Sequence, residues 1–165
     1  TFAADLKKSL PRLPLVEQVD DFWAFSRAGR ELANLHLNYE TIEPYRQCRV
    51  IYDAPLTTKG DSINYRVEKM RFGKLDSKTA DKRVIYYNHA ITIEGIPAEA
   101  YDYVVNGKSA IEWIMERYAV KGSGLGLSIA HQITNDPNDW AREHGDEKYI
   151  FNLLLRIINV SVQTV

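Results

Sequence analysis

The sequence predicts an α+β fold in which a small antiparallel or mixed sheet is flanked by several helices. Apolar residues recur at helical spacing in separate segments, whereas the stretch after Pro44 has short β-branched and aromatic runs between Pro, Gly and Asp. The links between these runs look too short for helical crossovers, which favours antiparallel pairing. With 165 residues, 45% of them hydrophobic, we expect a single domain over residues 1–165.

The helices follow from apolar spacing, caps and breakers. Pro11 and Pro14 stop a short amphipathic helix at the start of the chain, and Asp20 or Asp21 caps the next one. Ser109 caps a helix that the glycines from Gly122 onward break. The expected helices cover residues 2–10, 21–39, 97–101, 109–118 and 149–162.

The strands follow from the β-branched and aromatic runs. Met70 and Phe72 can extend the second run, and a polar turn separates it from the third. A second turn, rich in Asn and Asp, precedes the final helix. The expected strands cover residues 49–52, 63–67, 83–87 and 90–93, and the expected turns cover residues 73–81 and 135–139.

Composition excludes several classes of protein. The net charge of −1 excludes a histone-like polycation, and the single cysteine, Cys48, excludes an intrachain disulfide and the common zinc ribbons. The longest apolar run, near residues 150–165, is too short and too polar to span a membrane. No secretory signal opens the chain, so we expect a cytoplasmic protein, and the apolar end at Val165 suggests a piece of a larger one.

Positive charge gathers in one segment, since residues 66–83 carry a net charge of +4 and residues 84–165 a net charge of −4. Tyrosine and phenylalanine flank this segment, a mixture that suits a phosphate backbone. A solvated β-hairpin with lysines on its edge is the alternative, and one arginine can instead pair with Glu68 or Asp81. The candidate contacts are Arg66, Lys69, Arg71, Lys74, Lys78, Lys82 and Arg83.

Motifs for catalysis, nucleotides and metals are incomplete. The glycines of residues 122–126 resemble an ATP-lid loop, but the adenine-reading segment that should precede it is missing. Asp136-Pro-Asn138 lacks the second proline and the aromatic residue of an amino-methyltransferase motif. The four histidines have no metal-ligand spacing, and no GxSxG elbow is present. We therefore expect no catalytic residue, no metal ligand and no cofactor within this chain.

Segments spread over most of the chain are similar to one known family. They are residues 5–12, 21–33, 102–118 and 133–140, together with Tyr86, Asn88, Ile91, Ile93, Gly95, Ile96 and Pro97. The chain resembles the C-terminal specificity region of type ISP restriction-modification enzymes and of relatives labelled DEAD/DEAH-box helicases. The glycine-rich loop at residues 122–131 departs from that pattern.

The resemblance implies a non-catalytic target-recognition domain that binds double-stranded DNA. It also implies upstream nuclease, helicase-like ATPase and adenine-N6 methyltransferase domains in the same polypeptide, with S-adenosylmethionine, ATP and Mg²⁺ as their cofactors. A DNA-recognition role raises the basic residues to leading backbone contacts and adds polar residues at turns. These second candidates are Asn88, Asn106, Lys108 and Asn135, whereas Trp113 and Trp140 are expected in the core.

A nucleotide-binding module is a distant third interpretation, which a nucleotide titration would test, and one main alternative remains open from the residues themselves. A protein-interaction module would use the apolar final helix to dock on a neighbouring domain and would contact DNA little. The two interpretations differ in whether the seven basic residues lie on one face.

Overall fold

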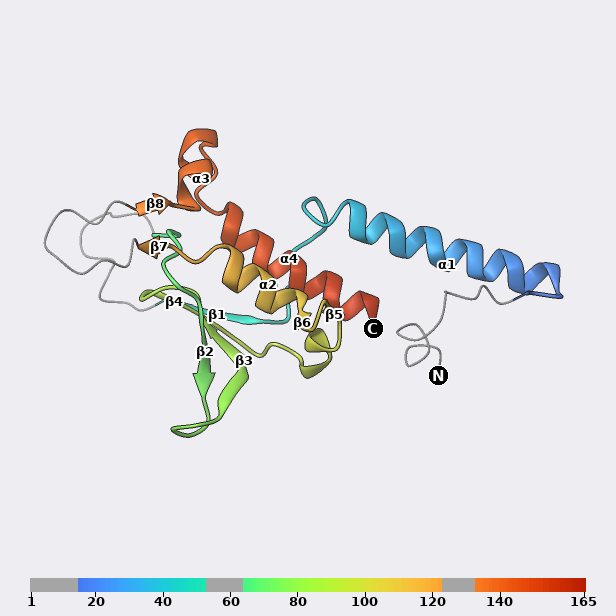
Figure 1. Cartoon of the computed structure of the whole chain (residues 1–165), viewed down its shortest axis with the longest axis horizontal. Coiled ribbons are helices and arrows are strands. Elements are labelled where there is room, and N and C mark those ends of the chain that lie inside the picture. The colour runs from blue at the N-terminus through green and yellow to red at the C-terminus, as the bar shows by residue number, and fades with distance from the viewer. Residues whose placement is uncertain (1–14, 53–63, 123–132) are drawn as a thin grey trace, which may run out of the picture. The chain divides into compact units, whose positions relative to one another are not determined.

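The structure, a computed structural model, describes residues 15–52, 64–122 and 133–165 (Figure 1). The chain divides into two compact units, Thr1–Leu37 and Asn38–Val165. The single domain over the whole chain therefore stays a prediction. The helix expected over residues 2–10 lies outside the described residues.

The described residues of the first unit form the helix α1 (Val19–Leu37), within two residues of the range expected at each end. Asp20 and Asp21 lie in its first turn, where carboxylates stabilise the positive end of the helix dipole. The helix buries none of its residues and leaves Phe22, Trp23 and Phe25 exposed.

The second unit is built on a four-stranded antiparallel sheet, which confirms the predicted α+β fold. The strand order is β1-β4-β3-β2, so β1 and β2 are the edges. Ile85 lies between Phe72 and Ile93 in the register, which aligns three apolar side chains across neighbouring strands. The strands are β1 (Arg49–Tyr52), β2 (Arg71–Lys74), β3 (Ala80–Tyr86) and β4 (Ile91–Glu94).

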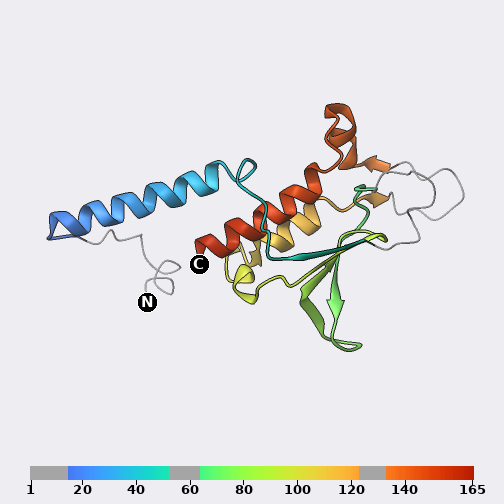
Figure 2. The ribbon, with the colours of Figure 1, turned by 180° about the vertical axis from the view of Figure 1, so that it is seen from behind.

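Helices cover one face of this sheet, and Figure 2 shows α2 and α4 side by side on it. The Ser109 side chain and Glu112 form a capping box that fixes the start of α2. No helix within the described residues is long and apolar enough to cross a bilayer. The helices are η3 (Ala98–Tyr101), α2 (Ala110–Arg117), α3 (Asn138–His144) and α4 (Tyr149–Thr164). Two small two-stranded sheets pair β5 (Val104–Val105) with β6 (Lys108–Ser109), and β7 (Lys121–Gly122) with β8 (Ile133–Asn135).

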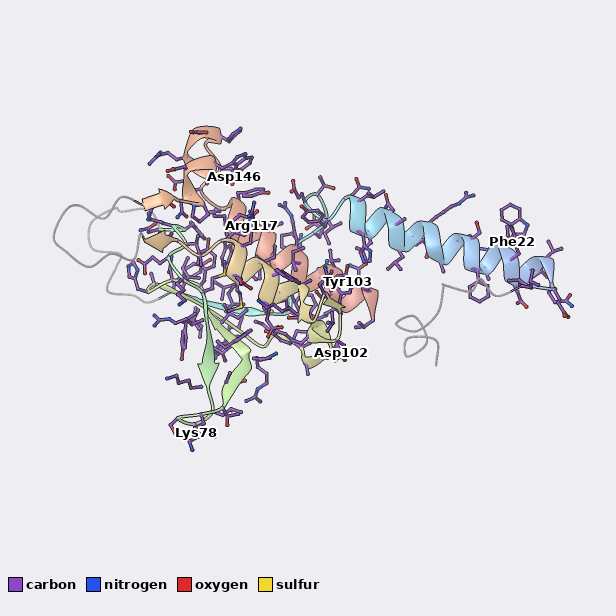
Figure 3. The ribbon with its side chains drawn as sticks, in the orientation of Figure 1. Phe22, Lys78, Asp102, Tyr103, Arg117 and Asp146 are labelled. Atoms are coloured by element: carbon purple, nitrogen blue, oxygen red, sulfur yellow. The ribbon has the colours of Figure 1, made fainter. Side chains whose placement is uncertain are left out.

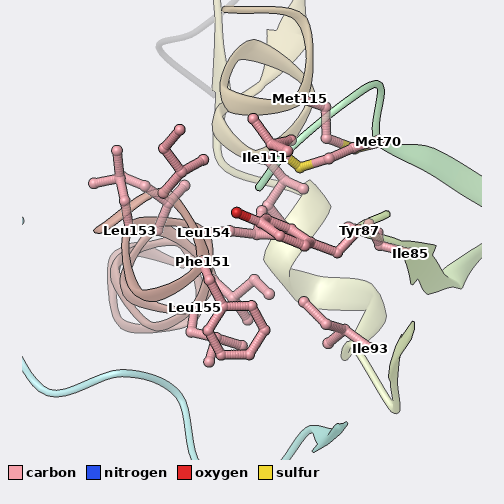
Figure 4. Close-up of a cluster of buried hydrophobic side chains, with 14 of the residues drawn as sticks. Met70, Ile85, Tyr87, Ile93, Ile111, Met115, Phe151, Leu153, Leu154 and Leu155 are labelled. Carbon is pink, nitrogen blue, oxygen red and sulfur yellow. The ribbon is translucent and has the colours of Figure 1, made fainter. Parts of the chain in front are cut away.

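The core lies between the sheet and α2, α4 and η3 (Figure 4). Tyr87 is fully buried, and its hydroxyl donates a hydrogen bond to the carbonyl oxygen of Tyr65 at 2.9 Å. The ring of Phe151 from α4 packs edge-on against both tyrosines. One face of α4 is thereby used inside this unit, which ties the end of the chain to the sheet.

The strand expected over residues 63–67 is wrong over the part that the structure describes. Residues 64–70 pair with no described strand and bend at Glu68, although Tyr65 and Val67 alternate with exposed neighbours as in a strand. Side chains satisfy the backbone here. Asn138 accepts from the Val67 N–H at 2.8 Å and donates to its carbonyl at 2.9 Å, and Asn88 donates to two further carbonyls.

Candidate nucleic-acid interface

Three of the seven basic residues predicted to contact a nucleic acid are engaged in ion pairs. Two carboxylate oxygens of Asp81 hold the guanidinium of Arg83 at 3.0 Å each, as the sequence left open. The three pairs are Arg66 with Asp136 at 2.5 Å, Lys82 with Glu112 at 2.9 Å, and Arg83 with Asp81. These charges are already balanced by the protein, which lowers their value as phosphate contacts.

The other four basic residues lie on or next to the β2–β3 hairpin and make no ion pair within the described residues. All four are exposed. Figure 3 shows Lys78 at the tip of the hairpin, away from the helices that cover the core. These four are Lys69, Arg71, Lys74 and Lys78, and we call them the hairpin basic residues.

Asp76 organises the tip of the hairpin. Its carboxylate accepts from the backbone N–H of Lys78 at 2.7 Å and of Thr79 at 2.8 Å. The hydrogen bond from Lys78, joined by those from Thr79, lowers the pKa of the Asp76 carboxyl. The Leu75 N–H donates to the Thr79 carbonyl at 3.0 Å and closes the turn. The tip is therefore formed before any ligand arrives.

A bulge sets the shape of the hairpin stem. The register shifts between Phe72 and Gly73. A Cβ on Gly73 would come within 2.9 Å of the Cβ of Val84, so glycine is required by this close approach of the two strands. The turn is shorter than the predicted range of residues 73–81, because β2 extends to Lys74 and β3 begins at Ala80.

Lys82 anchors the hairpin to the helical layer. Its ammonium lies 5.7 Å from the centroid of the Phe72 ring and 5.2 Å from that of Tyr101, in addition to its ion pair with Glu112. Burial alone would raise the pKa of Glu112, but hydrogen bonds from Ser109 and Lys82 outweigh it and lower the pKa to about 2. Lys82 thus serves to hold the hairpin in place.

The face of the sheet opposite the helices bears Arg71 and Tyr86 in register with each other. Tyr86 is 45% exposed and lies beside Thr92 of β4. From the sequence, Tyr86 is one of the aromatic residues that flank the basic segment and part of the family resemblance, but not a candidate contact. Its aromatic ring and the arginine beside it supply a stacking surface and a fork of hydrogen-bond donors on one face.

The second-ranked candidates differ in how exposed they are and in the partners that they contact. Asn88 is buried, and its side chain is fully used by the backbone, so it is not presented to a ligand. Asn106 is exposed with a φ of 51° in the β5–β6 turn, and Lys108 pairs with Glu116. The backbone of Asn135 belongs to β8, but its side chain lies outside the described part of the molecule.

The prediction that both tryptophans lie in the core is wrong. Trp113 is 39% exposed and donates through its indole N–H to the Val105 carbonyl at 2.7 Å. Trp140 is 45% exposed and stacks on His144, with ring centroids 4.2 Å apart. Both tryptophans therefore lie at the surface, where Trp113 hydrogen-bonds to Val105 and Trp140 stacks on His144.

A groove of about 930 Å³ lies between the 64–66 segment and α3. Its lining mixes Arg66, Arg142 and Lys148 with Asp146 and Glu147, so the positive charges are largely balanced by carboxylates. In the described residues there is also no cluster of three His, Cys, Asp or Glu side chains able to hold a metal ion. Of the glycine-rich loop at residues 122–131, only Gly122, at the end of β7, belongs to the described residues.

Comparison with known proteins gives a consistent result. A family described as the Type ISP C-terminal specificity domain matches residues 1–153. The chain is similar to part of the Type ISP restriction-modification enzyme LlaGI, solved as a nuclease-deletion mutant with a DNA substrate mimic. The identity is 41%, the TM-score is 0.72, and 99% of this chain and 11% of that one are covered.

Two further solved structures are similar. The ATP-dependent Type ISP restriction-modification enzyme LlaBIII bound to DNA has 40% identity and a TM-score of 0.73, with 99% of this chain and 9% of that chain covered. The DrdV–DNA complex shares the fold, with 24% identity, a TM-score of 0.68, and 99% and 15% of the two chains covered. This chain thus spans about a tenth of the length of the two Type ISP enzymes. The comparison with curated protein sequences gives no match.

Proposed function

The chain belongs to the family of Type ISP C-terminal specificity domains, and on that premise we propose that it recognises a specific sequence in duplex DNA without performing chemistry itself. It acts as the target-recognition part of a longer cytoplasmic restriction-modification polypeptide. The nuclease, ATPase and adenine-N6 methyltransferase of that polypeptide lie upstream and use Mg²⁺, ATP and S-adenosylmethionine. The solved relatives are described as DNA complexes, which supports DNA as the partner.

One observation carries the proposal, namely four exposed basic side chains that form no ion pair with the described residues and gather on or beside one hairpin whose tip Asp76 closes. A two-stranded β-ribbon fits the major groove of B-DNA, where base edges are readable. Lysine suits the phosphates as a flexible point charge, whereas the planar fork of Arg71 suits guanine. The hairpin therefore offers both backbone contacts and a candidate base contact.

The alternative is a module that docks on proteins through its final helix, and it requires an exposed apolar face on α4. Nine residues of α4 are buried in the second unit, including Leu153, Leu154 and Ile158. The polar residues Asn152, Arg156 and Asn159 account for much of what α4 leaves partly exposed. Docking through this helix would require the core to open.

The salt dependence of binding tests the proposal. Three lysine contacts to phosphates, with Arg71 on a base, predict a slope of about −2.7 for log affinity against log salt concentration on duplex DNA. Lys74→Gln and Lys78→Gln should each reduce the steepness by about 0.9 and weaken cognate and scrambled duplexes equally. Lys108→Gln, which removes a lysine already paired with Glu116, is the matched control and should leave the slope unchanged.

Arg71→Ala tests sequence reading separately. If Arg71 holds the O6 and N7 of a guanine, its loss should cost about 1–3 kcal/mol on the cognate duplex and little on a scrambled one. A flat salt dependence of the wild-type protein would refute binding through the DNA backbone. Equal losses for Arg71→Ala on both duplexes would assign it to a phosphate instead.

A further inference from the structure

Leu75 is an exposed aliphatic residue at the tip of the β2–β3 hairpin. Its side chain is 60% exposed and lies outside the hydrophobic core. Its backbone is fixed by the hydrogen bond from its N–H to the Thr79 carbonyl, beside the turn that Asp76 holds. The turn therefore holds an apolar side chain at a defined position where the described residues do not bury it.

Two lysines flank this side chain. Lys74 precedes it on β2, and Lys78 follows across the turn, and both are exposed without an ion pair in the described residues. Phosphate contacts fix the register and orientation of a protein on the duplex, and sequence is read at the base edges in the grooves. With Lys74 and Lys78 on phosphates, Leu75 is the apolar side chain between them that is free to enter a groove. In the major groove, the apolar feature of a base edge is the C5-methyl group of thymine.

We propose that Leu75 contacts the C5-methyl group of one thymine in the major groove and thereby determines specificity at that position. This inference rests on the proposed function, because it requires the hairpin to bind duplex DNA. It adds an apolar contact that the basic residues cannot make, since neither lysine nor arginine distinguishes thymine by its methyl group.

The test removes one methyl group at a time. The full-length protein first selects its preferred sequence from random duplex DNA, and each thymine of that sequence is then replaced singly by deoxyuridine. At one position, deoxyuridine should weaken wild-type binding about fourfold, the effect of one lost methyl contact. Leu75→Ala should bind the thymine duplex more weakly by at least as much and should not distinguish thymine from deoxyuridine.

Val165→Ala is the matched control, because Val165 is an aliphatic residue that is 62% exposed at the end of α4. It should retain the wild-type response to deoxyuridine. Since the Leu75 side chain is exposed, Leu75→Ala should keep the wild-type unfolding midpoint, so a change in binding does not reflect misfolding.

The remaining outcomes overturn the inference. In the first, the selected DNA site contains no thymine. In the second, Leu75→Ala still responds to deoxyuridine at every position at which the wild type does. In the third, Leu75 is needed to kink the DNA, but the wild type does not respond to deoxyuridine. The last result would identify Leu75 as a wedge between base steps. Salt-dependent DNA binding that persists in these cases leaves the proposed function intact, whereas a wild-type protein that binds no duplex DNA overturns both.

Discussion

Asn88 was a candidate DNA contact, and the structure instead makes it a structural residue whose loss is measurable. Its amide donates to the carbonyls of Asn64 and Arg66 at 2.9 Å each, and its oxygen accepts from the N–H groups of Ala90 and Ile91 at 2.9 and 2.8 Å. Asn88→Ala removes all four bonds. Because the side chain is only 8% exposed, water replaces them poorly.

The size of the effect follows from these bonds. A typical hydrogen bond contributes about 0.5–1.5 kcal/mol net, and a buried group left unpaired costs about 1–3 kcal/mol. The two N–H groups are buried, whereas the two carbonyls are part-buried and can regain water. We therefore expect Asn88→Ala to lower the free energy of unfolding by about 2–4 kcal/mol.

Urea unfolding followed by circular dichroism measures this loss, with an unchanged m-value as the sign that the unfolded state is unaffected. Asn159→Ala is the matched control, because it removes two exposed hydrogen bonds, one donated to the Glu43 carbonyl and one accepted from Gln163. Water can replace both, so the substitution should cost less than about 1 kcal/mol. An Asn88→Ala protein with wild-type stability and weakened DNA binding would refute the reasoning and restore Asn88 as a contact.

Three further perturbations probe the hairpin, its anchor and the core. Gly73→Ala places a Cβ 2.9 Å from that of Val84, so it should destabilise the protein by about 1–3 kcal/mol in urea unfolding and weaken DNA binding. The pKa of Glu112 is about 2, below its ordinary value of 4.5, so its stabilisation is complete above pH 4.5 and is lost as the pH falls towards 2. Glu112→Gln should therefore lose less stability than the wild type in an acid titration between pH 5 and pH 2, when both are followed by circular dichroism. Leu154→Ala empties a fully buried position and should lower the urea-derived free energy of unfolding by about 2–5 kcal/mol.

Local sequence patterns were sufficient for most of the second unit. The periodicity of the 109–118 segment and the Ser109 cap predict α2, and short connections predict the antiparallel sheet. The 63–67 strand fails because the same alternating burial occurs in a paired strand and in an irregular segment without strand partners. What decides between them is Asn138, 71 residues from the Val67 N–H to which it bonds.

The candidate site was predicted only in part, for a related reason. Sequence identifies the basic segment, but it does not show which charges are neutralised. Arg83 pairs with Asp81 two residues away, a pairing that the local sequence indicates. Lys82 pairs with Glu112 from α2, 30 residues away, which requires the tertiary fold. A role for Leu75 could not be predicted, because a single leucine in a polar turn has no periodicity to interpret.

The hairpin tip is closed by its own backbone and by Asp76, and Leu75 and Lys78 there take no part in the hydrophobic core. Substitutions at such positions cost little folding stability. Under the proposed function, the DNA sequence that is read can therefore diverge quickly among relatives while the scaffold stays constant. The same separation makes residues 74–79 a natural segment to exchange when a new target sequence is to be engineered.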